Sequence, residues 1–234
     1  QEHPDKEIVF VGVGFETTTP LVAMAIKRAQ ALGLKNFSVF VAHKNMPNAL
    51  EVIVSDPELK IDALILPGHV STIIGTKPYE FLAEKYGIPG VITGFEPVDV
   101  LQGIAMIMRQ LHEGRAEIEI AYSRGVMREG NPVALAAIDE VFDTVDATWR
   151  GLGVIPGSGY AIREEFEDFD AVKRFHPEVE PTQNPKGCRC GDVLRGIMAP
   201  DECPLFRKVC TPENPVGPCM VSSEGSCAAY YRYY

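Results

Sequence analysis

The stretch Glu7-Ile-Val-Phe-Val-Gly-Val13 decides the fold class of this chain of 234 residues. It is a nearly continuous run of β-branched and aromatic residues, which is typical of a strand buried on both faces of a parallel sheet. A helical pattern follows, because Thr19-Pro20 is a favourable helix start and the apolar residues after it fall on one stripe that ends at Gly33. The sequence therefore begins with a strand, a loop and a helix.

The same unit recurs along the chain. Further strands are predicted at Phe37–Ala42, Asp62–Leu66, Gly90–Thr93 and, less regularly, Glu117–Ala121; the helices are predicted at Pro47–Val54, near Ser71, at Tyr79–Tyr86, Pro97–Leu111 and Pro132–Phe142. Strands that alternate with helices in this way predict an α/β fold, with an open, mostly parallel sheet and flanking helices.

The composition changes after Trp149. The glycine-rich stretch Trp149–Gly159 and the acidic run Glu164–Asp170 predict a connector with a solvated face. From Pro177 onward, proline and cysteine dominate and the helical period fades. We therefore expect a Rossmann-like α/β domain at residues 1–155 and, at residues 156–234, a connector followed by a small lobe organised by a cofactor.

All cysteines of the chain lie in the last forty-odd residues: Cys188, Cys190, Cys203, Cys210, Cys219 and Cys227. Three kinds of chemistry could explain this clustering: disulfide bonds, a structural zinc site or an iron–sulfur cluster. Disulfides suit small secreted domains, whereas this chain is long and apolar enough to build a core. Zinc usually shows Cys-x2-Cys pairs, which are absent here. Iron–sulfur clusters accept wider spacings and need thiolates alone, so we favour a cluster and leave the other two open.

The charge and hydropathy of the chain exclude several classes of partner. A formal net charge of −10, with no run of lysines or arginines, opposes binding to nucleic acid or to an anionic membrane. No apolar stretch approaches the roughly 18 residues of a membrane span, and no signal peptide is recognisable. We expect a cytoplasmic protein with a small-molecule or protein partner. Because the sequence starts at Gln1 and enters a strand pattern at once, we also expect the native start to be missing.

Three loops follow the ends of predicted strands: Gly12–Pro20, Pro67–Thr72 and Thr93–Pro97. Ligands of open α/β sheets bind beyond the carboxyl ends of the strands. The first and third loops share a Gly-Phe-Glu triplet, which predicts Glu16 and Glu96 at equivalent heights, and the second loop contains His69. These side chains could transfer protons or bind a metal ion. Neither phosphate-binding glycine motif is matched, so a nucleotide site is only weakly supported.

Several motifs together resemble the HypD family of [NiFe]-hydrogenase maturation scaffolds. They are Gly14-Phe-Glu-Thr-Thr18, Pro67-Gly-His-Val-Ser71, Gly94-Phe-Glu-Pro97 with Asp99 and Leu101-Gln-Gly103, Trp149-Arg-Gly-Leu-Gly153, and the tail Cys203-Pro-Leu-Phe206 with Val221-Ser-Ser-Glu-Gly225 and Cys227. The resemblance implies one [4Fe-4S] cluster in a C-terminal lobe. It also implies a platform, shared with the chaperone HypC, on which an iron atom acquires one CO and two cyanide ligands. Cyanide would come from HypE, and a redox or transferase-like activity is an open expectation.

The resemblance also implies roles for individual residues. The cluster ligands would be Cys190, Cys203, Cys210 and Cys227, and the extra thiols of Cys188 and Cys219 could form a redox pair. His69 would lie near the nascent iron site. The cleft or the partner-docking surface would be lined by Glu16, Thr17, Thr18, Glu96 and Glu224.

One departure from the family pattern is expected to limit the activity. Family members begin with a further α/β segment that carries a Cys-Gly-Gly-His-Thr-His motif and a Gly-Pro-Gly-Cys-Pro-x-Cys motif, and neither occurs here. The chain resembles the C-terminal two-thirds, so we expect that it does not build the cofactor unaided. Two other classes stay open: an electron-transfer or docking module with a structural cluster, and a small-molecule enzyme that uses Glu16, His69 and Glu96 as acid–base groups.

Overall fold

The computed structural model describes residues 3–178 and 185–234, which separate into two compact units. The first unit takes the described residues of Gln1–Ala49, Asp62–Ala147 and Pro156–Glu178, and the second takes those of Leu50–Ile61, Thr148–Ile155 and Val179–Tyr234. The predicted division between residues 155 and 156 stays a prediction, because these units are defined by contacts and not by independent folding.

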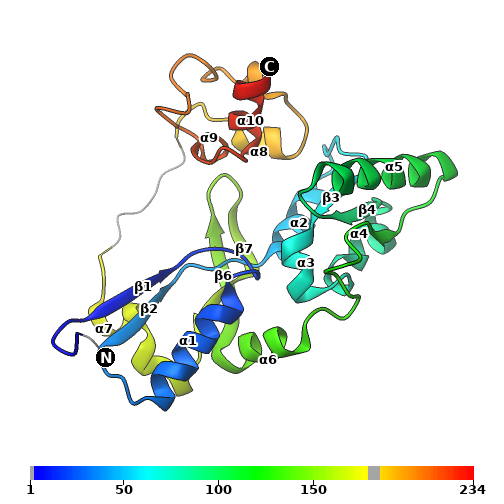
Figure 1. The fold of residues 1–234 in the computed structure, drawn as a ribbon. Coiled ribbons are helices and arrows are strands. Elements are labelled where there is room, and N and C mark those ends of the chain that lie inside the picture. The colour runs from blue at the N-terminus through cyan, green and yellow to red at the C-terminus, as the bar shows by residue number, and fades with distance from the viewer. Residues whose placement is uncertain (1–2, 179–184) are drawn as a thin grey trace. The chain divides into compact units, whose positions relative to one another are not determined.

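The first unit begins with a two-stranded parallel sheet (Figure 1). Its strands are β1 (Ile8–Gly12) and β2 (Phe37–Val41), and Ile8 lies opposite Phe37 in the register. Helix α1 (Thr19–Ala31) connects the two strands and starts with a proline in its first turn. It buries apolar side chains from Val22 to Ala29 at helical spacing, which is the stripe that the sequence predicts.

A second group of elements completes the core around α1. They are α6 (Pro132–Val141), β6 (Phe142–Trp149), β7 (Gly153–Ile162), the 3-10 helix η2 (Glu164–Phe169) and α7 (Ala171–Phe175). The buried core residues are Val22, Ala23, Ile26, Ala29, Val39, Ala137, Ile138, Val141, Phe142, Ile162, Phe166 and Phe169. Strands β6 and β7 form a sheet of their own. In the acidic run, Phe166 and Phe169 are buried in this core, and the charged residues around them form the predicted solvated face, because Glu164, Glu165, Glu167 and Asp168 are exposed.

A three-stranded parallel sheet forms the other part of the first unit. Its order is β3 (Leu64–Pro67), β4 (Gly90–Thr93) and β5 (Ile118–Ile120). The helices around it are α3 (Gly68–Ile74), the 3-10 turn η1 (Lys77–Tyr79), α4 (Glu80–Tyr86) and α5 (Pro97–Glu113). Helices α4 and α5 end at Gly87 and Gly114, whose positive φ angles suit glycine at the end of a helix.

The second unit contains short helices: α8 (Cys190–Leu194), the 3-10 turn η3 (Pro200–Glu202), α9 (Pro218–Val221) and α10 (Ser226–Tyr233). Its earlier segment begins within α2 (Met46–Val54). Arg195 joins this segment to α8, because its guanidinium pairs with Asp56 and its carbonyl accepts the Lys60 N–H at 3.1 Å. No helix in the described ranges has both the length and the apolar character that crossing a bilayer requires.

The predicted α/β class is confirmed, with mostly parallel sheets and flanking helices. The parallel strands are divided between two sheets. The stretch Trp149–Gly159 was predicted as a connector, and this is wrong, because it contains the end of β6 and most of β7. Its glycines concealed the strand pattern.

The burial predicted for the first strand is also wrong. Residues Ile8 to Val11 are 43–61% exposed, and Val13 is 66% exposed. The physical reason is that β1 lies at the edge of its sheet, with β2 as its single neighbouring strand among the described residues.

Candidate functional site

The six thiols gather in one core within the second unit. Four of them are buried, with exposed fractions of 4–8%: Cys190, Cys210, Cys219 and Cys227. Cys188 and Cys203 are half-buried and pack against the same core. The helices hold three of the thiols, because Cys190 starts α8, Cys219 lies in α9 and Cys227 lies in α10. All six are free thiols.

Three of the sulfur atoms form a hydrogen-bonded series. The Cys219 thiol donates to Cys227 Sγ at 3.1 Å, and the Cys190 thiol interacts with Cys219. A fourth sulfur, Cys210 Sγ, accepts the backbone N–H of Val216 at 3.4 Å. The series brings two of the predicted ligands, Cys190 and Cys227, to the same sulfur, that of Cys219.

The hydrogen bonds shift the pKa values of these three thiols in different directions. The bond to Cys219 and burial raise the pKa of Cys190, whereas the bond from Cys219 lowers the pKa of Cys227. For Cys219, the bond from Cys190 lowers the pKa, but the bond to Cys227 together with burial outweighs it and raises the pKa to about 12. Cys227 is therefore the thiol most readily ionised in this series, and a thiolate is the form that binds metal.

Glycine gives the sulfur atoms room. A Cβ atom at Gly217 would lie 2.5 Å from Cys188 Sγ and 4.0 Å from the Cβ of Cys190. A Cβ at Gly151 would lie 3.6 Å from Cys190 Sγ. Larger residues at Gly217 would push into the space between the first two cysteines, so this glycine keeps that side of the core open.

Aromatic side chains surround the thiols. Phe206 packs edge-on against Tyr230 and Tyr231, with ring centroids 5.9 and 5.8 Å apart. Arg207 places its guanidinium 5.2 Å from the Tyr231 ring and donates to the Tyr231 carbonyl at 3.1 Å. Phe206 lies in the same core as the thiols, and Tyr230 and Tyr231 pack against it.

The free thiols of this core are donors of the kind that an iron–sulfur cluster uses. In the described residues, no three His, Cys, Asp or Glu side chains are close enough to share one ion. A cluster makes a different demand, because each of its iron atoms takes one thiolate and the ligand sulfurs are spread around the inorganic core. Several free, largely buried thiols in one small core meet that demand. The residues present therefore fit a cluster in number and in chemistry.

Glu16 lies in a second region, at the carboxyl end of the first sheet. It is 2% exposed, and its Oε1 accepts the Met46 N–H at 2.9 Å. Its Oε2 has no hydrogen-bond partner among the described residues. Burial raises the pKa of this carboxyl group, although the Met46 bond acts in the opposite direction. Glu16 therefore favours the protonated form more than a surface glutamate does.

His43 stands beside this loop and was missed in the sequence. Its ring is 2% exposed, neither ring nitrogen has a partner in the described structure, and burial lowers its pKa. The loops after β1 and β2 are joined by backbone bonds from Ala42 to Gly12 and from Lys44 to Gly14, at 2.7 and 2.9 Å. The position of His43 just after a strand was the available signal.

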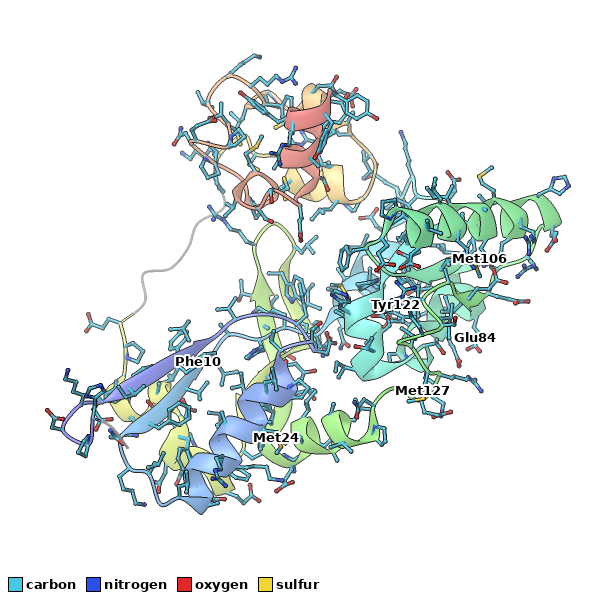
Figure 2. All side chains as sticks on the ribbon, viewed as in Figure 1. Phe10, Met24, Glu84, Met106, Tyr122 and Met127 are labelled. Atoms are coloured by element: carbon cyan, nitrogen blue, oxygen red, sulfur yellow. The ribbon has the colours of Figure 1, made fainter. Side chains whose placement is uncertain are left out.

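His69 lies at the carboxyl end of the other parallel sheet, at the start of α3. It is exposed and stands edge-on to Phe95, with ring centroids 4.8 Å apart, and the centroid of the Tyr122 ring is 6.4 Å away. Figure 2 labels Tyr122. Phe95 is itself 69% exposed. An exposed histidine and an exposed phenylalanine in contact form a surface that suits a partner protein or a ligand.

Glu96 belongs to a charged network on the same edge. Arg124 binds both carboxylate oxygens of Asp99, at 2.8 and 2.6 Å, and Glu96 at 2.6 Å. The guanidinium also lies 4.5 Å from the Tyr122 ring. The Arg124 hydrogen bonds lower the pKa of Asp99. Arg124 organises this edge, and its role could not be predicted from the sequence because it belongs to no recognised motif.

The remaining predicted residues are on the surface. Thr17, Thr18 and Glu224 are exposed. Thr18 precedes α1, but its hydroxyl donates to the Phe15 carbonyl at 3.2 Å and does not cap the helix. Glu16 and Glu96 belong to different sheets, and no hydrogen bond or ion pair among the described residues joins Glu16 to His69 or Glu96. The proposed roles of all these residues stay predictions.

The fold and this site define an α/β protein that carries a compact thiol-rich unit. The family described as "HypD: Hydrogenase formation hypA family" matches residues 1–234. The chain belongs to this family.

Curated relatives agree with the family match. The chain is 49% identical to "Hydrogenase maturation factor HypD" of Cupriavidus necator, 50% identical to "Hydrogenase expression/formation protein HupD" of Azotobacter chroococcum mcd 1, and 45% identical to "Putative hydrogenase expression/formation protein MJ0993" of Methanocaldococcus jannaschii. These alignments cover 98–100% of this chain. The chain spans 63–64% of the length of these relatives.

Proposed function

We propose that this protein acts in hydrogenase maturation, as a scaffold and redox protein for the assembly of an iron centre that carries one CO and two cyanide ligands. Membership of the HypD family and the printed names of its relatives support the maturation role. The observation that carries the redox part is the gathering of six free thiols in one largely buried core. We propose that the protein acts in the cytoplasm.

Under this proposal, Cys190, Cys203, Cys210 and Cys227 hold a [4Fe-4S] cluster. Such a cluster stores and passes single electrons, which carboxylate, imidazole and hydroxyl groups cannot do. The hydrogen bond from Cys219 lowers the pKa of Cys227 and so favours its thiolate, and Phe206, Tyr230 and Tyr231 pack in the same core. Cys188 and Cys219 are then extra thiols, and we propose that they serve as a redox pair beside the cluster.

The edge of the three-stranded sheet would contribute the docking surface. A HypC-type chaperone and a HypE-type cyanide donor are the partners that we propose. Exposed apolar side chains support docking here, because Phe95 is 69% exposed and α5 presents a stripe at helical spacing. The stripe consists of Val98, Leu101, Ile104, Met108 and Leu111. The same stripe supports a second candidate function, in which the protein is a docking module and its cluster is structural.

The ligand assignment can be tested one thiol at a time. Each cysteine is replaced by serine, and the anaerobically purified proteins are compared for iron and acid-labile sulfide. Substitution of Cys190, Cys203, Cys210 or Cys227 should abolish the cluster or lower its content by at least about half. Substitution of Cys188 or Cys219 should leave the content unchanged. The assignment would be contradicted if the Cys188→Ser protein lost its cluster and the Cys190→Ser protein kept it.

His69→Ala separates a chemical role from docking. The exposed ring contacts Phe95 and Tyr122 and supports no buried core, so the variant should fold normally. Loss of maturation with HypC-type binding kept would favour a chemical role of His69, whereas loss of that binding would favour docking. If maturation and binding both survive, His69 has no part in either role.

A further inference from the structure

The ring of Tyr122 contacts two loops at the carboxyl end of the three-stranded sheet. Tyr122 follows β5, and its N–H donates to the Ile92 carbonyl of β4 at 3.1 Å. A Cβ atom added at Gly68, Gly94 or Gly125 would lie 3.0, 2.9 or 2.7 Å from a carbon of this ring. The ring therefore lies directly on the backbone at these glycines, where a larger residue would displace it.

Two of these glycines immediately precede the exposed rings of the same edge. Gly68 precedes His69, and Gly94 precedes Phe95. The His69 ring stands edge-on to Phe95 and lies next to Tyr122, and no described residue makes a hydrogen bond to it. The imidazole is therefore oriented by its ring contacts and by the loop that carries it. Its nitrogens remain available to a ligand or a partner.

Arg124 fixes the Tyr122 ring from the other direction. Its guanidinium lies 4.5 Å from the ring centroid and binds both carboxylate oxygens of Asp99, at 2.8 and 2.6 Å. Asp99 is 5% exposed, and the missing side chain of Gly94 makes room for it, because a Cβ atom there would lie 2.1 Å from Asp99 Oδ2. A guanidinium that stacks on a ring and binds a carboxylate at two points has little freedom to rotate.

These contacts form a continuous series from α5 to His69. Asp99 holds Arg124, Arg124 covers the Tyr122 ring, and that ring supports the backbone next to His69. Filling the core does not explain the ring, because Tyr122 is half-buried and its neighbour Ala121 makes the core contact with Val91 and Ile107.

We propose that Tyr122 and Arg124 are positioning residues for His69. The stacked pair sets the orientation of an imidazole that has no hydrogen bond of its own within the described structure. A binding or reacting group must be held within a narrow range of geometry, and rigid neighbours supply that constraint. This inference rests on the proposed role of the sheet edge in maturation and extends it to the residues that orient His69.

The proton signals of the His69 ring test the proposal. Because neighbouring aromatic rings shift these signals, they should lie away from their values in an unstructured peptide in the wild-type chain. The histidine signals are resolved by two-dimensional NMR, and the signals that disappear in His69→Ala identify those of His69.

Arg124→Lys is the first variant. Lysine keeps a positive charge for Asp99 but loses the planar stacking and the two-point binding, so the His69 signals should move toward their unstructured values. Arg128→Lys is the matched control, because Arg128 lies in the same segment between β5 and α6 but pairs with Glu80. It should leave the His69 signals in place. Equal shifts in the two variants would overturn the proposal.

Two variants of Tyr122 separate the ring from the hydroxyl group. Tyr122→Phe keeps the ring and should keep the His69 signals of the wild type, whereas Tyr122→Leu should move them at least as far as Arg124→Lys does. Unchanged His69 signals in Tyr122→Leu would overturn the proposal. If Tyr122→Leu does not fold, the comparison of Arg124→Lys with Arg128→Lys decides the matter.

The assays of maturation and of HypC-type binding separate this inference from the proposed function. Arg124→Lys should reproduce whichever effect His69→Ala has, and Tyr122→Phe and Arg128→Lys should behave as the wild type. Normal activity of Arg124→Lys beside a defective His69→Ala would overturn the positioning role. If His69→Ala has no effect in either assay, the proposed role of His69 fails, and the NMR signals still decide whether Tyr122 and Arg124 orient it.

Discussion

At the scale of single residues, Glu16 shows how a loop motif becomes a buried group. The Gly-Phe-Glu triplet places Glu16 in the loop after the first strand, but the sequence alone does not reveal that this side chain is buried. The structure fixes Oε1 on the Met46 N–H and leaves Oε2 unpartnered among the described residues. Burial favours the neutral form of such a carboxyl group, because an ionised carboxylate without a full set of partners is unfavourable in free energy away from water.

Glu16→Gln should change the pH dependence of stability. Because burial raises the pKa of Glu16 in the folded state, the folded protein holds a proton that the unfolded chain releases. The wild type therefore loses stability as the pH rises from the unfolded pKa through the folded pKa. Glutamine keeps an oxygen for Met46 and does not titrate.

Urea unfolding from pH 4 to pH 8 measures this effect. The free energy of unfolding of Glu16→Gln, relative to the wild type, should increase with pH over that range. The control is Glu58→Gln, which changes an exposed glutamate. A relative stability of Glu16→Gln that is constant or falls with pH would contradict the raised pKa.

Gly75 is a second position where one residue decides local structure. It follows α3 at φ 76°, and a Cβ atom there would overlap the Arg128 carbonyl oxygen. Gly87 has a similar φ of 66° but open space around it. Gly87→Ala should destabilise the protein by about 1 kcal/mol, and Gly75→Ala by at least about 2 kcal/mol more. Chemical denaturation of the two variants checks the difference, and equal losses would show that the contact with Arg128 is unimportant.

At the scale of helices and strands, periodicity predicted the elements well. The helix predicted at Pro97–Leu111 is confirmed as α5, which continues to Glu113, and the strand predicted at Gly90–Thr93 is confirmed as β4. The prediction failed for β7, because the glycines in Trp149–Gly159 are typical of a connector, and no strand was predicted at the position of β6. The predicted burial of β1 was wrong. An apolar run shows that a strand is suited to burial, but it does not show how many strands lie beside it in the sheet.

Helix α6 offers a test at this scale. Its N-cap, Asn131, accepts the N–H groups of Val133 and Ala134, both at 3.1 Å. Asn131→Ala should therefore lower the free energy of unfolding by about 1 kcal/mol, whereas Asn131→Asp should keep the cap. Thermal and urea unfolding of both variants measure the loss. Equal stability of the alanine variant and the wild type would show that α6 is held by its core contacts alone.

At the scale of the whole molecule, the site was predicted unevenly. The cysteines could be found from their clustering alone, since thiols with no shared chemistry would be scattered along the chain. Arg124 could not, because only the folded sheet brings Asp99 to it. His43 was missed although it follows a strand, because its burial beside Gly12 depends on two loops that are distant in sequence. The predicted grouping of Glu16 with Glu96 came from a repeated triplet, and the two glutamates lie on different sheets.

The two units should respond differently when the metal is removed. If thiols and inorganic iron form the centre of the second unit, chelation under oxidising conditions should expose the amides of α8, α9 and α10 to exchange. The first unit has its own aliphatic and aromatic core and should be unaffected, with α1 as the internal control. Equal protection of α10 before and after chelation would show that this unit folds without metal.

The central claim is that thiolates of the second unit bind a [4Fe-4S] cluster. The most direct measurement is a Mössbauer spectrum of the anaerobically purified protein enriched in iron-57, with iron and acid-labile sulfide counted on the same sample. We predict a spectrum of a [4Fe-4S] cluster and equal amounts of iron and sulfide, about four of each per chain. Iron without sulfide, zinc in its place, or cysteines joined in disulfides in the freshly purified protein would contradict the claim.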